Sequence, residues 1–153
     1  MADIHIEEFY KDAAIALVQL YNAFPRRVNL FVEDIAGPDE PDEFGLHSKR
    51  HMACFGTLLW LAEEGLLRYV DTIRQEALDQ AVLTQQAFVR MSSPASQVLQ
   101  EQQAADNAEN LPPAIREDFS THIHLLRTAL RSGSSARISH VMQAAFFRDG
   151  SDY

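Results

Sequence analysis

The sequence is poor in cysteine, in long apolar runs and in positive charge. Cys54 is the only cysteine among 153 residues, so no disulfide can form within the chain. This excludes a small secreted fold held together by disulfides. No apolar run approaches the roughly 20 residues needed to cross a bilayer, and the start, 1–5, lacks the basic and apolar regions of a signal peptide. We therefore expect a cytoplasmic protein with no membrane contact.

The chain carries 13 Lys and Arg against 22 Asp and Glu, which gives a net charge of −9. This charge argues against broad, non-specific binding to nucleic acid, because neutralising phosphates requires a clustered positive face. It leaves a local basic patch open. The hydrophobic fraction of 46% is that of an ordinary globular protein. A chain of this length forms one compact domain, or a small domain with an appendage.

The first part of the chain is predicted to be mainly helical. Apolar residues recur three or four positions apart over Asp3–Phe24, which predicts a helix that ends at Pro25. A brief extended piece over 26–30 and a short helix over 31–36 follow. Gly37 closes the short helix, because glycine tolerates the backbone conformations that end helices.

A loop and a second long helix come next. The segment 37–45 holds two prolines, two glycines and four acidic residues, which predicts a solvated surface loop. Ser48 is a good N-cap, and the helix it begins runs to Glu64 and stops at Gly65. Its predicted apolar face comprises Met52, Phe55, Leu59 and Ala62, widened by Leu58 and Leu61.

The apolar period then changes from that of a helix to that of a strand. Residues 66–74 are rich in strand-forming side chains. Residues 75–80 are polar and turn-like, and 81–83 form a short returning strand. Thr84 can cap a further helix over 85–91. The pattern therefore predicts a β-hairpin between two helices.

The remainder, 93–153, is predicted to be a helical appendage. Ser93 and Pro94 give the signature of a helix start, for a short Gln-rich helix. A polar connection over 105–113 follows, then two helices joined by a turn at 132–134 and a frayed tail over 149–153. The two helical stripes comprise Ile115, Phe119, Ile123, Leu126 and Leu130, and then Ile138, Val141, Met142, Ala145 and Phe146. They predict an antiparallel pair of helices.

Two motifs carry a resemblance to a known family. Residues 58–69 read LLWLAEEGLLRY, and 81–87 read AVLTQQA. With the order of elements over 1–92, they resemble the winged-helix variant of the helix-turn-helix. In that family a recognition helix ends in Leu-x-x-Glu-Gly-Leu and enters the wing, and the second wing strand ends in Leu-Thr-x-x-Gly. Position 87 is Ala rather than Gly here, and the loop over 37–45 is longer and more acidic than a tight helix-turn-helix turn.

The resemblance implies a mostly α fold, with a winged-helix three-helix core and β-hairpin wing over 1–92. It also implies a regulator of transcription that binds double-stranded DNA. In DNA-binding members the start of the recognition helix enters the major groove while other side chains hold phosphates. The implied groove-facing residues are Ser48, Lys49, Arg50 and His51, and the implied phosphate contacts are Arg68, Arg74 and Arg26. A homodimer formed through 93–153 would match a two-fold operator.

A second function remains open, because winged helices also serve as protein-interaction modules. The negative charge and the acidic loop favour a subunit of a larger complex that makes no DNA contact. The stripes of the last two helices indicate either an internal core or a dimer interface. Phe146 and Phe147, beside a polar tail, are a candidate patch for a protein partner.

Metal binding and catalysis are not expected. His47 and His51 lie four residues apart and would share one face of a helix, whereas His122 and His124 would point apart. A metal site needs three or four converging ligands, and the sequence indicates no further partner. Cys54 fits a small buried residue. With no phosphate-binding loop or nucleophile elbow, we expect no enzyme and no cofactor.

Overall fold

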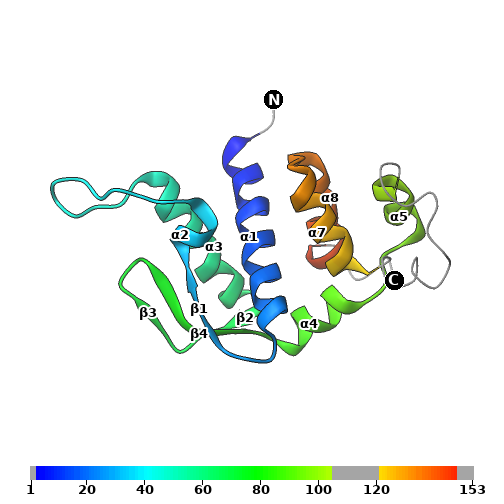
Figure 1. Cartoon of the computed structure of the whole chain (residues 1–153), viewed down its shortest axis with the longest axis horizontal. Coiled ribbons are helices and arrows are strands. Elements are labelled where there is room, and N and C mark those ends of the chain that lie inside the picture. Colours follow the sequence, from blue (N-terminus) through cyan, green and yellow to red (C-terminus); the bar gives the residue numbers. More distant parts are fainter. Residues whose placement is uncertain (1–2, 105–120, 148–153) are drawn as a thin grey trace. The chain divides into compact units, whose positions relative to one another are not determined.

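The computed structural model describes residues 3–104 and 121–147, of which 102–104 are described by their backbone alone (Figure 1). The described chain is mostly helical, with one small antiparallel sheet. The chain divides into two compact units, 1–87 and 88–153. The sequence predicted a boundary after residue 92. That position is the last residue of the helix over 85–92, and the division after residue 87 falls inside this helix. No helix among the described residues combines the length and apolarity needed to span a membrane.

Three helices form one side of the first unit, as the sequence predicted. They are α1 (Ile4–Ala23), α2 (Val32–Ala36) and α3 (Lys49–Glu63), and each packs against the other two. The buried face of α1 consists largely of alanine, which lets neighbouring elements approach closely. Ser48 caps α3, because its hydroxyl oxygen accepts a hydrogen bond from the His51 N–H at 3.1 Å.

The predicted apolar face of α3 is confirmed for Phe55, Leu58 and Leu61, which are buried. Met52, Leu59 and Ala62 are only half-buried, so the buried face is centred about one residue away from the predicted stripe. The middle of this helix is apolar nearly all round, so hydrophobic periodicity cannot fix which side packs inward. The side chains of α3 that are buried are His51, Cys54, Phe55, Thr57, Leu58 and Leu61.

The sheet is organised around one central strand. Strand β4 (Ala77–Leu83) pairs with β1 (Val28–Phe31) on one edge, and with β2 (Leu67–Arg68) and β3 (Asp71–Ile73) on the other. All pairings are antiparallel. Strands β2 and β3 pair with β4 in the same register, so residues 67–83 form a single hairpin.

The returning strand of this hairpin begins at Ala77, earlier than predicted, and the turn comprises only residues 74–76. The polar residues over 75–80 had suggested a longer turn, but Gln80 belongs to a β-bulge opposite β1. Its φ is +54°, and the side-chain oxygen of Asn29 accepts its N–H at 3.1 Å. A polar residue inside a strand thus marks a bulge here.

The two motifs behind the family resemblance meet in space. Gly65 has a φ of +79° where the chain leaves α3 for β2. The Thr84 hydroxyl donates to the Gly65 carbonyl at 2.7 Å and accepts the Ala87 N–H at 3.2 Å. Thr84 therefore caps α4 (Gln85–Ser92), as predicted, and joins its start to the end of α3.

The second unit contains α5 (Gln97–Ala104), α7 (His122–Ser132) and α8 (Ser135–Phe146). The predicted start of α5 is wrong, because Ser96 accepts the Leu99 N–H at 3.2 Å and Pro94 instead forms an isolated β-bridge with Thr121. The connection over 105–113, Ile115, Phe119 and the tail over 149–153 lie outside the described residues.

The predicted pair of helices is confirmed. Helices α7 and α8 pack together and are joined at Gly133, whose left-handed φ of +71° ends α7. All five predicted stripe residues of α8 are buried, including Phe146. The expectation that Phe146 contributes to an exposed patch is therefore wrong. Buried side chains in α7 are Ile123, Leu125, Leu126 and Ala129.

Candidate functional site

Two of the basic residues predicted to contact DNA lie at one end of the first unit. Lys49 is the exposed first residue of α3, and Arg74 is exposed in the hairpin turn. A hydrogen bond connects these two elements, because His51 Nε2 lies 2.7 Å from the Gln75 carbonyl oxygen. Neither Lys49 nor Arg74 forms an ion pair within the described part of the chain.

Arg26 and Arg68 are also exposed but lie at the opposite end of the sheet. Arg68 pairs with Val82, whereas Arg74 lies in the turn. At about 3.3 Å per residue, the six residues from Arg68 to Arg74 span roughly 20 Å. Arg26 precedes β1, whose first pair is with Ala81. The predicted phosphate contacts therefore form two separate groups.

Arg50 is committed to a structural ion pair. Its guanidinium donates two hydrogen bonds, at 2.7 and 2.6 Å, to the carboxylate of Asp12 on α1. Asp12 is only 1% exposed. The hydrogen bond to Asp12 raises the pKa of Arg50 above its usual value. The prediction that Arg50 faces a groove is corrected, because its charge compensates a buried carboxylate.

The prediction that His51 faces a DNA groove is also wrong. It is 4% exposed and lies on the inner face of α3. A side chain buried in this way cannot read a base edge. The sequence reading failed because the same residue could belong to either side of a helix that is apolar nearly all round.

The start of α3 already holds a carboxylate. Asp39 Oδ2 accepts the Ser48 N–H at 3.2 Å and lies 2.9 Å from His47 Nδ1. Hydrogen bonds from Ser48 and then His47 lower the pKa of Asp39 to about 2. Ser48 was expected to bind a phosphate at the N-terminus of α3. The carboxylate of Asp39 accepts the Ser48 N–H there instead.

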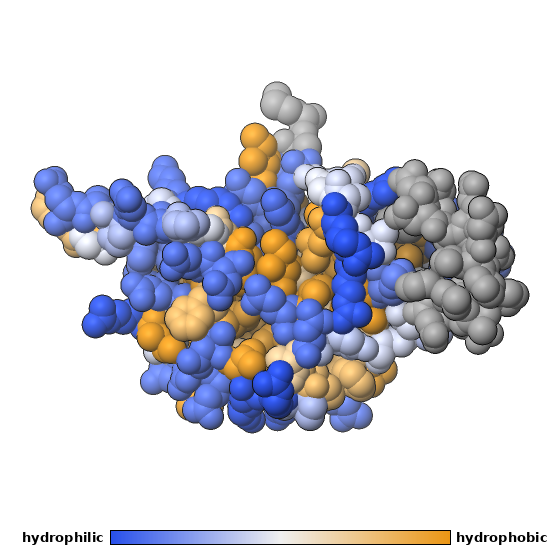
Figure 2. All heavy atoms as spheres, viewed as in Figure 1, coloured by the Kyte–Doolittle hydropathy of each residue, from blue (hydrophilic) through white to orange (hydrophobic). Residues whose placement is uncertain are grey.

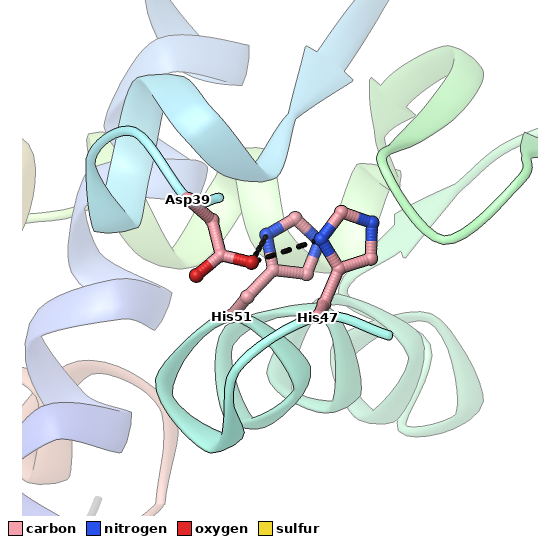
Figure 3. Close-up of side chains that lie close together, drawn as sticks. All are labelled: Asp39, His47 and His51. Carbon is pink, nitrogen blue, oxygen red and sulfur yellow. Dashed lines mark hydrogen bonds and ion pairs between the residues drawn. The ribbon is translucent and has the colours of Figure 1, made fainter. Parts of the chain in front are cut away.

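Asp39, His47 and His51 form a compact cluster (Figure 3). The two imidazole rings stack with centroids 3.8 Å apart and planes 7° from parallel. One potential ligand atom from each of the three residues lies within 4.8 Å of the others. His51 Nδ1 is 3.9 Å from Asp39 Oδ2 and has no hydrogen-bond partner among the residues that the structure describes.

Only part of the signal for this cluster is present in the sequence. The spacing of His47 and His51 indicated a shared helical face, although His47 lies just before the helix and its cap. Asp39 comes from the loop, eight residues earlier than His47. Nothing in the periodicity of the sequence indicates how a loop without regular structure folds back onto a helix start.

The loop between α2 and α3 contains an ordered turn. Asp42 Oδ1 accepts the N–H groups of Phe44 and Leu46, both at 2.9 Å. The Asp42 backbone also pairs with Gly45 and Leu46, and Gly45 has a φ of +77°. Phe44 is 78% exposed and Leu46 is 63% exposed. Figure 2 shows the loop at the left as mostly hydrophilic, so two apolar side chains project from an acidic setting.

Cys54 is fully buried on α3, as the sequence predicted. Burial, followed by the charge of Asp12, raises the pKa of its thiol to about 12. A thiol in this state is a poor nucleophile and a poor metal ligand. Comparison of the chain with protein-family models, curated proteins and solved structures finds no match.

Proposed function

We propose that residues 1–87 form a winged-helix domain that serves as a protein-interaction subunit. The order of elements, α1, β1, α2, α3 and then a hairpin, supports the first part of this proposal. So does the sheet, in which β4 lies between β1 and β2. The Thr84 hydrogen bond to Gly65 joins the two motifs that carry the family resemblance.

The ordered turn at Asp42 carries the proposed interaction. Exposing Phe44 costs free energy in water, and the turn fixes its backbone before any partner arrives. Aromatic side chains are enriched in the buried centres of protein interfaces. The partner that fits is a protein with an apolar pocket rimmed by Lys or Arg, because exposed acids surround these apolar side chains. Those acids are Glu40, Asp42 and Glu43.

Local charge favours this function over DNA contact through α3. The cations available at the start of α3 and at the hairpin turn are Lys49 and Arg74. The three acids of the loop and Glu76 in the turn outnumber them. Phosphates would therefore meet net repulsion at this end of the domain.

The test replaces the apolar side chains of Phe44 and Leu46 and identifies the proteins that crosslink to the loop. A photo-crosslinking amino acid is placed at Glu43 in cells that naturally make the protein, in an otherwise native chain and in the double variant Phe44→Ala/Leu46→Ala. Val70→Ala is the matched control, because Val70 is 61% exposed and lies outside the loop. We expect a defined crosslinked protein that the double variant loses and the control keeps. If the double variant keeps every crosslink, the loop is not the interface.

DNA binding is the second candidate function. Lys49 and Arg74, which form no ion pair with any described residue, favour it. Fluorescence polarisation with sheared genomic duplex at about 50 and about 200 mM salt tests it, because phosphate-driven affinity falls steeply over this range. The variant to use is Lys49→Ala/Arg74→Ala, with exposed Lys11→Ala as the control. Arg50 is unsuitable, since its loss would destabilise the fold. Binding that weakens with salt and is lost only in the double variant would favour the DNA-binding regulator.

The predicted homodimer also remains a proposal. Among the described stripe residues of α7 and α8, all but the half-buried Leu130 are buried within the chain, so a dimer would have to use mainly other side chains of 93–153. Light scattering coupled to size-exclusion chromatography measures the mass directly. A mass of 17.3 kDa is that of the single chain, and twice this mass would show the dimer.

A further inference from the structure

We propose that Asp39, His47 and His51 form a binding site for a divalent first-row transition metal, with Zn²⁺ as the reference ion. The site joins the loop between α2 and α3 to the start of α3 and the hairpin turn. It supplies two imidazole nitrogens and a carboxylate oxygen. This inference does not depend on whether the domain binds protein or DNA.

The buried nitrogen of His51 is the first argument. His51 Nε2 lies 2.7 Å from the Gln75 carbonyl oxygen, which can only accept a hydrogen bond, so Nε2 carries the proton. In a neutral ring Nδ1 then has a lone pair. That atom is buried and has no hydrogen-bond partner within the described part of the chain. An unsatisfied buried acceptor costs free energy, which a bound cation would recover.

The neighbouring carboxylate strengthens this argument. Asp39 Oδ2 faces His51 Nδ1 at 3.9 Å and accepts the Ser48 N–H at 3.2 Å. Two atoms that both carry lone pairs face each other favourably only when a proton or a cation lies between them. A metal ion satisfies both. His47 Nδ1, which donates to Asp39 in the absence of an ion, becomes a ligand when the proton of that ring is carried by Nε2 instead.

The distances suit a small ion. Bonds of about 2.0–2.1 Å in tetrahedral geometry place ligand atoms roughly 3.3 Å apart. The observed separations from Asp39 Oδ2 are 2.9 Å to His47 Nδ1 and 3.9 Å to His51 Nδ1. The rings are nearly parallel, so binding requires the His47 side chain to rotate toward the ion, while Gln75 holds His51. Glu76 Oε1 lies 4.0 Å from His47 Nε2, the ring nitrogen that does not face Asp39.

The surroundings hold two of the ligands in position. Metal-binding histidines commonly donate their other ring N–H to a backbone carbonyl, as His51 does to Gln75. The Ser48 N–H similarly fixes the carboxylate of Asp39. A site with two imidazoles and one carboxylate favours Zn²⁺, Ni²⁺ or Cu²⁺ over Ca²⁺ or Mg²⁺, which take oxygen ligands.

The experiment titrates Zn²⁺ into the full chain, prepared without an affinity tag and stripped with a chelator, by isothermal calorimetry. We expect one ion per chain. Asp39→Asn, His47→Gln and His51→Gln should each weaken binding at least about tenfold, since loss of even a supporting group costs that much. His140→Gln is the control, because His140 is exposed and belongs to the other unit, and its affinity should be unchanged.

Cobalt absorption gives a second readout. Co²⁺ at this site should show d–d bands without the intense charge-transfer band of a thiolate, because Cys54 is buried and protonated. Circular dichroism checks that each variant folds. If His51→Gln unfolds, Asp39→Asn and His47→Gln decide the result. The proposal is overturned if stoichiometric binding is absent, or if the folded variants bind as tightly as the parent; a proton, not a metal, would then lie between His51 and Asp39.

Discussion

The ion pair between Arg50 and Asp12 shows how a residue suggestive of function can be structural. The position of Arg50 in the sequence, between Lys49 and His51 at a helix start, indicated nucleic-acid recognition. The structure instead pairs it with a carboxylate on α1 that is almost inaccessible to water. Desolvating a carboxylate is costly. Removing one partner of such a pair is therefore expected to lower the free energy of unfolding more than replacing both partners.

Arg50→Ala should therefore destabilise the protein by about 3 kcal/mol, because it leaves the Asp12 charge buried without compensation. Urea denaturation followed by circular dichroism measures this change. Lys49→Ala, at the exposed neighbouring position, should change stability by less than about 0.5 kcal/mol. The double variant Asp12→Leu/Arg50→Met should recover most of the loss. A cost below about 1 kcal/mol for Arg50→Ala would show that water reaches Asp12 in solution.

Asp39 gives a pH-dependent prediction. Its folded pKa of about 2 lies below the roughly 3.9 expected in an unfolded chain. A lowered folded pKa stabilises the protein fully above the unfolded value, and this contribution is lost as the pH falls from about 4 to about 2. The stability difference between the parent and Asp39→Asn should therefore shrink across that window.

Urea denaturation at pH 7, 4 and 3 in the presence of a chelator measures this difference. Glu43→Gln is the control, because it removes an exposed carboxylate of the same loop. A difference that stays constant for Asp39→Asn would mean that Ser48 and His47 do not hold the carboxylate in solution.

At the scale of elements, several helix ends and glycine positions could be predicted, as could the buried face of α8. The start of α5 and the buried side of α3 could not. Ser48, Gly65 and Thr84 act through local backbone geometry, which sequence encodes directly. The buried side of α3 depends on which other elements cover it, so local periodicity could not fix it. Asp39 is the extreme case, because it reaches the histidine cluster from a loop without regular structure.

Thr84 offers a test of the junction between elements. Thr84→Val keeps the shape of the side chain but removes the hydrogen bond to Gly65 and the cap on the Ala87 N–H. We expect a loss of about 1–2 kcal/mol in the free energy of unfolding. Thr72→Val on β3 is the control, since valine suits a strand and the Thr72 hydroxyl forms no hydrogen bond in the described chain. Equal stability of the two variants would contradict a structural role for this junction.

The whole molecule combines a strongly negative charge with a first unit whose core is built around α1 and α3. Cys54 lies inside that core, with none of its surface exposed. As the only cysteine in the chain, it reports on the opening of the core as a whole. Its raised pKa adds chemical protection, because only the thiolate reacts with alkylating reagents.

We expect Cys54 to resist iodoacetamide at pH 8 in native buffer and to react fully in denaturant. The free energy obtained from the native labelling rate should match that from urea denaturation, because α3 must leave the core before the thiol can ionise. Mass spectrometry measures the labelling. Arg50→Ala should accelerate it in proportion to its loss of stability, whereas Lys49→Ala should not. Rapid labelling with an unchanged circular dichroism spectrum would show that α3 opens locally, and would place the weakest part of the fold beside the histidine cluster.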